Sequence, residues 1–177
     1  MAAAWDQVAT RLVAERGDAL VRYATLLTGS PEDGADLVQD ALVRTFGRPR
    51  MALTVPRAEA YVRRAVLNAV IDRSRREQRW RGIRHLVVEP DAVASAEVAT
   101  DDRLDLAARV RALSPRQAAC VVLRYHEDLP VARIAEVLGI STGAVKRYLS
   151  DAIRALSSDL DGAGERRTTT GGPHVRS

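Results

Sequence analysis

A cluster of arginines with one aromatic residue inside it is the densest concentration of positive charge in the chain. Its members fall within twelve consecutive residues: Arg73, Arg75, Arg76, Arg79, Arg81 and Arg84, together with Trp80 and the single acid Glu77. Guanidinium groups bind phosphates and an indole ring stacks on bases, so this composition suits contact with nucleic acid. A solvated helix face has the same composition, and the cluster alone does not separate the two interpretations.

A second pattern, at residues 129–149, predicts a helix, a tight turn and another helix. Ala135 is small where two helices cross closely, and Gly139 can adopt the left-handed conformation that ends the first helix. A helix-turn-helix of this kind places the start of its second helix in the major groove of DNA. An ordinary helical hairpin with glycine at its turn is the alternative. The residues predicted to contact DNA are Ser141, Thr142, Gly143, Lys146, Arg147 and Arg154.

Catalytic and metal chemistry find less support in the sequence. Asp33, Asp36 and Asp40 resemble a carboxylate metal cluster, but no second acidic motif faces them. The three histidines are scattered, and Cys120 falls among apolar residues, where packing is its expected role. A single cysteine also excludes an intramolecular disulfide and a cysteine-rich zinc site. We therefore expect no enzyme activity, no catalytic residue, no metal and no cofactor.

Helices must position these residues, and apolar residues recur at helical spacing through most of the chain. Ser30 followed by Pro31 is a helix start, and Ser114, Pro115 and Gln117 form a second one with a capping-box pattern. The expected helices span residues 5–27, 31–46, 56–79, 115–126, 130–138 and 142–160, with a short helix at 101–112.

Charge and composition divide the chain into parts. Residues 1–88 hold 15 arginines against 10 acidic residues, whereas residues 89–112 hold three against six. Residues after 160 are rich in glycine and threonine and are expected to be disordered. The predicted parts are a first domain at 1–80, an acidic linker at 81–111, a helix-turn-helix domain at 112–160 and a tail at 161–177.

The composition predicts an all-α fold of two small helical domains joined by a flexible linker, the C-terminal one a helix-turn-helix. Hydrophobic residues make up 46% and charged residues 28% of the 177 residues, as in globular proteins. Seven aromatic residues are few for a large β core. The sequence has no run approaching 18 apolar residues and no signal-peptide pattern, so we expect a cytoplasmic protein without a membrane span.

Three longer motifs resemble bacterial sigma factors. Residues 113–146 resemble the sigma domain that recognises the promoter −35 element. Residues 33–46 resemble the sigma helix that docks on core polymerase. Residues 60–76, with the pattern Asn-x-x-x-Asp-x-x-Arg-Arg, resemble the helix that opens the −10 element. The two N-terminal motifs form one block and the C-terminal motif forms a second. Two such blocks, in this order along the chain, look like an extracytoplasmic-function (ECF) sigma factor of the sigma-70 family, most similar to small actinobacterial SigE-like members.

The resemblance implies a protein that directs core polymerase to specific promoters and opens the −10 element. It assigns polymerase docking to Asp36, Gln39 and Asp40, which lie three and four residues apart on one helix. Asp72 is expected to pair with Arg75 or Arg76. The implied partners are core RNA polymerase, promoter DNA and an anti-sigma factor, with no membrane. The residues assigned to the −10 element are Asn68, Arg75, Arg76 and Arg79.

The alternative function is a stand-alone helix-turn-helix regulator, such as the output protein of a response regulator. A receiver domain needs alternating strands and helices with an apolar strand before an acidic site, and residues 1–80 show no such strand. The chain departs from the sigma pattern at Gly34, where many relatives carry an acid, and at Pro130, where Ser or Thr is usual. We also expect the linker to leave the spacing of the two domains unset in the free chain.

Overall fold

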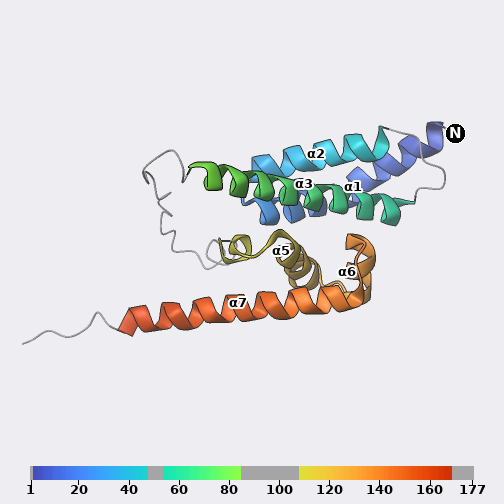
Figure 1. The fold of residues 1–177 in the computed structure, drawn as a ribbon. Coiled ribbons are helices and arrows are strands. Elements are labelled where there is room, and N and C mark those ends of the chain that lie inside the picture. Colours follow the sequence, from blue (N-terminus) through green and yellow to red (C-terminus); the bar gives the residue numbers. More distant parts are fainter. Residues whose placement is uncertain (1, 48–53, 85–107, 169–177) are drawn as a thin grey trace, which may run out of the picture.

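The computed structural model describes residues 2–47, 54–84 and 108–168, with side chains for 6–47, 54–80 and 108–157. All regular structure in these ranges is helical, which confirms the predicted fold class. The helices form two layers (Figure 1): the N-terminal helices α1, α2 and α3 make one, and α5, α6 and α7 make the other.

The first layer holds α1 (Ala2–Thr28), α2 (Pro31–Phe46) and α3 (Val55–Arg84). The predicted start of α2 is confirmed, because the Asp33 N–H donates to the hydroxyl of Ser30 at 3.2 Å. Gly34 is buried where α2 crosses α1, and a Cβ placed there would lie 2.7 Å from the backbone nitrogen of Thr25. Close packing of the two helices therefore explains this departure from the sigma pattern.

The second layer begins with a helical turn at 108–112 and continues with α5 (Pro115–Val121). The capping box is present: the Ser114 N–H donates to Gln117 Oε1 at 3.0 Å, and the Gln117 N–H donates to Ser114 Oγ at 3.5 Å. The sequence predicts one helix to His126, but from Val122 to His126 the backbone forms a π-helix, η1. A hydrogen bond to the residue five positions earlier defines this register: the Glu127 N–H donates to the Val122 oxygen at 3.2 Å.

The helix-turn-helix consists of α6 (Val131–Leu138) and α7 (Thr142–Thr168). Gly139 ends α6 with φ +67°, as predicted, and the Ile140 N–H closes the turn on the Ala135 oxygen at 3.1 Å. Ser141 caps α7 by accepting a hydrogen bond from the Ala144 N–H at 3.1 Å.

The last helix is longer than the sequence predicts. The sequence places its end at residue 160 with a disordered tail beyond it, whereas α7 continues to Thr168. Residues 161–168 include alanine, glutamate and arginine, which are good helix formers, and they extend a helix that is already nucleated. The remaining tail, 169–177, lies outside the described residues.

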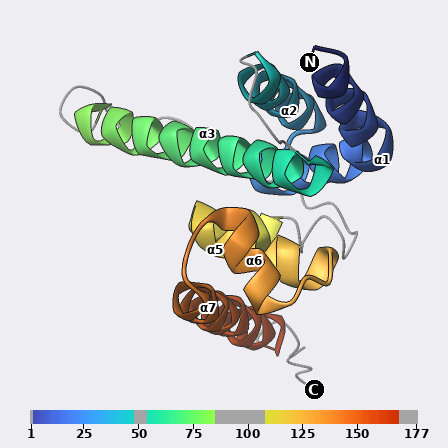
Figure 2. The ribbon, with the colours of Figure 1, turned by 90° about the vertical axis from the view of Figure 1, so that its right-hand side faces the viewer.

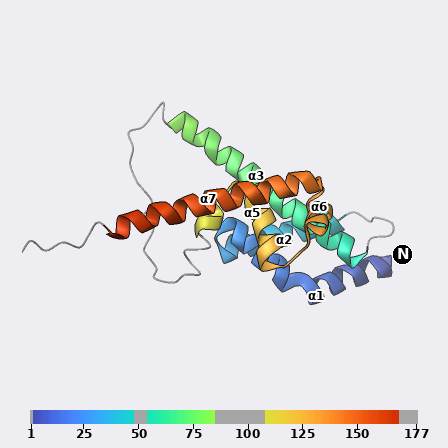
Figure 3. The same cartoon turned by 90° about the horizontal axis from the view of Figure 1, so that it is seen from below.

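One buried apolar cluster runs through both layers. It includes Tyr23 of α1 and Val66 of α3 together with Cys120 and Leu123 of the second layer. Figures 2 and 3 show α3 lying across the second layer, where it contacts α5 and α6. The linker at 85–107 lies outside the described residues, but the expectation that the spacing of the domains is unset is wrong, because the two layers are packed together.

Candidate nucleic-acid interface

The acidic face of α2 is exposed. Asp36, Gln39 and Asp40 all face solvent, while Val38 and Ala41 on the other side of the helix are buried. The predicted docking residues therefore share one accessible surface that the apolar side of α2 positions.

A third acid of α2, Asp33, has a different role from that of the exposed face. It accepts a hydrogen bond of 2.8 Å from Arg73 Nη1 of α3. This bond raises the pKa of the Arg73 guanidinium, and Glu77, 3.3 Å from Arg73 Nε, adds to the effect. Arg73 thus ties two helices of the first layer together, although in the sequence it belongs to the basic cluster.

The second half of α3 presents the predicted −10 residues to solvent. Trp80 is 66% exposed beside them. Arg76 Nε donates to the backbone oxygen of Asp72 at 3.3 Å. This contact between the two residues therefore uses the backbone of Asp72 and not its carboxylate. The side chains of Arg81 and Arg84 lie outside the described residues. The exposed predicted residues are Asn68, Arg75, Arg76 and Arg79.

The start of α7 presents the predicted −35 residues. The helix is held by its buried side, which includes Val145, Leu149 and Ala152. The Arg147 guanidinium lies 5.4 Å from the centre of the Tyr148 ring, and Arg154 pairs with Asp151 of the same helix. Five predicted residues at the helix start are exposed: Ser141, Thr142, Gly143, Lys146 and Arg147.

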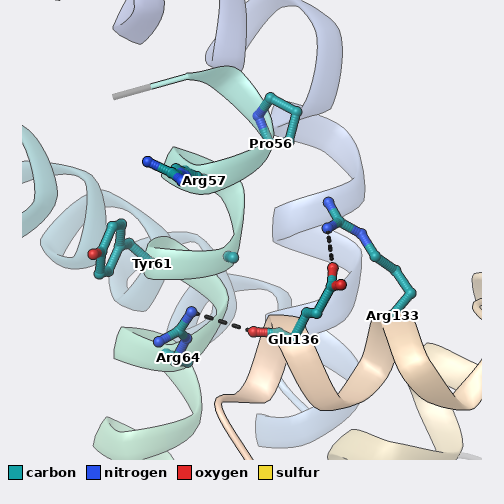
Figure 4. A pocket seen from close by; sticks show the side chains of 7 residues that line it. Pro56, Arg57, Tyr61, Arg64, Arg133 and Glu136 are labelled. Carbon is teal, nitrogen blue, oxygen red and sulfur yellow. Dashed lines mark hydrogen bonds and ion pairs between the residues drawn. The ribbon is translucent and has the colours of Figure 1, made fainter. Parts of the chain in front are cut away.

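A cavity of about 390 Å³ opens between the start of α3 and α6, and Figure 4 shows its lining. Arg64 reaches across it and donates from Nε to the Val137 oxygen at 2.9 Å and from Nη2 to the Glu136 oxygen at 3.3 Å. The carboxylate of Glu136 is bound instead by Arg133 of the same helix at 2.7 Å. Arg64 therefore joins the two layers through backbone oxygens at the C-terminal end of α6.

A partly buried ionic cluster, here called the clasp, also joins the layers. It consists of Arg16 of α1, Glu59 and Arg63 of α3, and Glu127 at the end of η1. Arg63 is 1% exposed and donates to both oxygens of Glu127, from Nη1 at 2.7 Å and from Nη2 at 2.5 Å. It also donates from Nε to Glu59 at 3.1 Å. The sequence does not predict the clasp, because Arg63 and Glu127 are 64 residues apart and lie in different motifs.

Two further findings concern the described residues alone. Within residues 2–47, 54–84 and 108–168, no helix has both the length and the apolarity that a membrane crossing requires. Across the same residues, histidine, cysteine, aspartate and glutamate form no group of three or more that could hold a metal ion.

Comparison with known proteins assigns the chain to a family. The family model of sigma-70 region 2 matches residues 12–81, and that of sigma-70 region 4 matches residues 103–156. The RNA polymerase sigma-E factor of Streptomyces avermitilis is 35% identical over 84% of this chain and 83% of its own. The chain belongs to the extracytoplasmic-function sigma factors of the sigma-70 family.

Further similar proteins agree with this assignment. The ECF RNA polymerase sigma factor SigL of Mycobacterium tuberculosis is 33% identical, with 94% of this chain and 96% of SigL covered. A solved sigma factor, RpoE of Bartonella quintana in complex with the anti-sigma factor NepR, has the same fold, with a TM-score of 0.62 and 21% identity over 86% of this chain and 96% of that one. Because regions 2 and 4 occur together in sigma order, the chain is a sigma factor and not a stand-alone helix-turn-helix regulator.

Proposed function

We propose that this ECF sigma factor docks on core RNA polymerase through α2, holds the −10 element on α3 and contacts the −35 element with the start of α7. One observation carries the proposal: the three predicted sets of residues are exposed on three different helices, and each helix is fixed by a buried opposite side. The protein works in the cytoplasm with polymerase and promoter DNA as its partners, and it uses no cofactor and catalyses no reaction itself.

Docking is assigned to the acidic face of α2. Asp36 and Asp40 are one helical turn apart, with Gln39 beside them, so two negative charges and an amide lie together on an exposed surface. Such a surface suits a basic partner on the polymerase, and complementary charge would guide the encounter.

The −10 element is assigned to the exposed side of α3. The Asn68 amide can donate to and accept from a base edge, and the exposed arginines at 75, 76 and 79 can bind the phosphates of the same strand. An opened promoter exposes unpaired bases, and the ring of Trp80 offers a stacking surface worth about 1–3 kcal/mol per base.

The −35 element is assigned to the exposed start of α7. Lys146 and Arg147 can bind base edges or phosphates in the major groove, and Gly143 has no side chain to hold the DNA backbone away. Ser141 and Thr142 add hydroxyl groups at the same end. Arg154, which is paired with Asp151 in the same helix, is assigned to phosphate.

An anti-sigma factor completes the proposed set of partners. The support is the similar fold of the Bartonella quintana sigma factor, which was solved in complex with its anti-sigma factor.

Reversing a charge on α2 tests the docking assignment. The substitution Asp40→Arg should weaken binding to core polymerase at least about ten-fold, because like charges brought together at an interface cost several kcal/mol. The measurement is titration of labelled sigma factor with core enzyme, with circular dichroism to confirm the helical fold. Asp18→Arg, the same reversal at an exposed position of α1, is the matched control and should bind like the wild type. Wild-type affinity of Asp40→Arg would remove α2 from the docking surface.

A further inference from the structure

The cavity between the start of α3 and α6 carries three guanidinium groups that the proposed function leaves without a role. Its volume is about 390 Å³, and Figure 4 shows side chains from both helices around it. None of its lining residues belongs to the three sets assigned to polymerase and promoter. The cavity is therefore a candidate site for a further ligand.

The positive charge of this cavity comes from two helices. Arg57, Tyr61 and Arg64 are four and three residues apart, so successive turns of α3 bring them to one side of that helix. Arg133 of α6 lines the same cavity. Glu136 supplies the one carboxylate of the lining, so three cations are opposed by a single negative charge. An anion bound among them would balance this charge.

The three guanidinium groups keep N–H donors available. No described residue forms a hydrogen bond or an ion pair with the guanidinium of Arg57. Arg64 uses Nε and Nη2 on backbone oxygens of α6, which leaves Nη1. Arg133 bonds to Glu136 through Nη1, and the two side chains are 40% and 66% exposed. Because an exposed ion pair is weak, an incoming anion can replace the Glu136 carboxylate on Arg133.

Phosphate is the anion that this arrangement suits best. Each phosphate group offers several oxygens, and a guanidinium group binds two of them through parallel N–H donors. The helix α3 begins at Val55, so Pro56 and Arg57 of the cavity lie in its first turn, where the helix dipole is positive. Donors from two helices can hold more than one phosphate group at once.

Tyr61 gives the cavity an aromatic surface. Its side chain is 39% exposed, and the Arg64 guanidinium lies 5.3 Å from the ring centre. A nucleobase can stack on the exposed part of such a ring. The cavity volume falls within the range of about 300–1,000 Å³ that small-molecule sites occupy. Its size and lining therefore suit a mononucleotide.

From these observations we propose that the cavity is a binding site for a nucleoside diphosphate or triphosphate. The phosphates lie among Arg57, Arg64 and Arg133, and the base stacks on Tyr61. The sigma factor thereby has a small-molecule ligand besides its macromolecular partners. The inference does not rest on the proposed function, because it uses other residues and is tested on the free chain without polymerase or promoter.

The test is calorimetric titration of the free chain with GTP, ATP and inorganic pyrophosphate at moderate salt. Arg57→Gln and Arg133→Gln should each weaken nucleotide binding about ten-fold, because each removes charged hydrogen bonds to phosphate. Arg22→Gln removes the same charge from an exposed position of α1 outside the cavity and should bind like the wild type. Circular dichroism confirms that each variant is folded.

Two further variants separate this site from a general attraction of anions to a basic protein. Glu136→Gln removes the carboxylate that competes for Arg133 and should tighten nucleotide binding about three-fold. Tyr61→Leu keeps an apolar side chain but removes the ring. It should weaken nucleotide binding about ten-fold and leave pyrophosphate binding unchanged.

Three results would overturn the proposal. The first is absence of nucleotide binding by the folded wild type, and the second is an equal loss of affinity in Arg22→Gln and Arg57→Gln. The third is pyrophosphate bound as tightly as the nucleotides with no effect of Tyr61→Leu, which would show a phosphate site without base recognition. Binding of a single-stranded oligonucleotide through Arg57 and Arg133, with none of the mononucleotides, would also contradict it, because the cavity would then be part of the nucleic-acid surface.

Discussion

Arg63 is the one charged residue that is buried in the described part of the chain. A buried guanidinium is tolerated only when its N–H groups are bonded, and here Glu59 and Glu127 accept from Nε, Nη1 and Nη2. Its guanidinium also lies 4.9 Å from the centre of the Tyr23 ring, a cation–π contact within the same core. At the residue scale, the burial of Arg63 therefore depends on its hydrogen bonds to these two carboxylates.

The pKa of Glu59 determines how this contribution to stability changes with pH. Burial opposes its ionisation, but hydrogen bonds from Arg16 and Arg63 outweigh burial and lower the pKa of the carboxyl group. A lowered folded pKa stabilises the fold above the unfolded value near 4.3, and this contribution is lost as pH falls through the folded value. Glu59→Gln should cost about 3 kcal/mol of unfolding free energy at pH 7 and less at pH 3.

Urea unfolding at the two pH values measures the effect of Glu59→Gln. Glu15→Gln breaks an exposed pair with Arg11 and is the matched control, expected to change the unfolding free energy by less than about 1 kcal/mol at either pH. A cost of Glu59→Gln that is the same at pH 7 and pH 3 would contradict the assigned ionisation.

At the scale of elements, the features that depend on neighbouring residues could be predicted from the sequence. The starts of α2 and α5 follow from serine, proline and glutamine within four residues, and the turn after α6 follows from Gly139. The π-helix could not be predicted, because apolar spacing does not distinguish it from an α-helix and its register is set by bonds made beyond its end, at Glu127 and Leu129. The extension of α7 to Thr168 could not be predicted either, because a glycine-rich composition ordinarily favours the end of a helix.

Gly34 supplies a test of how α1 and α2 pack. An alanine there would place Cβ 2.7 Å from the Thr25 backbone, which cannot move aside as a flexible side chain can, so Gly34→Ala should destabilise the fold by about 1–3 kcal/mol. At Gly17 of α1 the nearest atom is a Val13 methyl at 3.8 Å, so Gly17→Ala should be neutral or stabilising by up to about 1 kcal/mol. Urea unfolding compares them, and equal effects of the two substitutions would contradict the close crossing of the helices.

At the scale of the whole molecule, the sequence predicts the two regions, their order and the surfaces assigned to polymerase and DNA. It does not predict that the regions pack on each other. The contacts that join them are long-range, as with Arg63 and Glu127 or Arg64 and Val137, and the donor and acceptor of each lie in different regions. The acceptors of Arg64 are backbone oxygens, which no residue type can signal.

The central claim is that the chain selects promoters only as a subunit of polymerase. The direct measurement is fluorescence anisotropy of a labelled promoter duplex and a scrambled duplex at moderate salt, with sigma factor alone, core alone and both together. We predict weak, unselective binding by the free chain and strong preference for the promoter with core enzyme. Changing Lys146 and Arg147 to alanine should reduce that preference by about 1–3 kcal/mol for each base-edge hydrogen-bonding pair that the substitution removes. Tight, selective binding of the promoter by the free chain would contradict the claim.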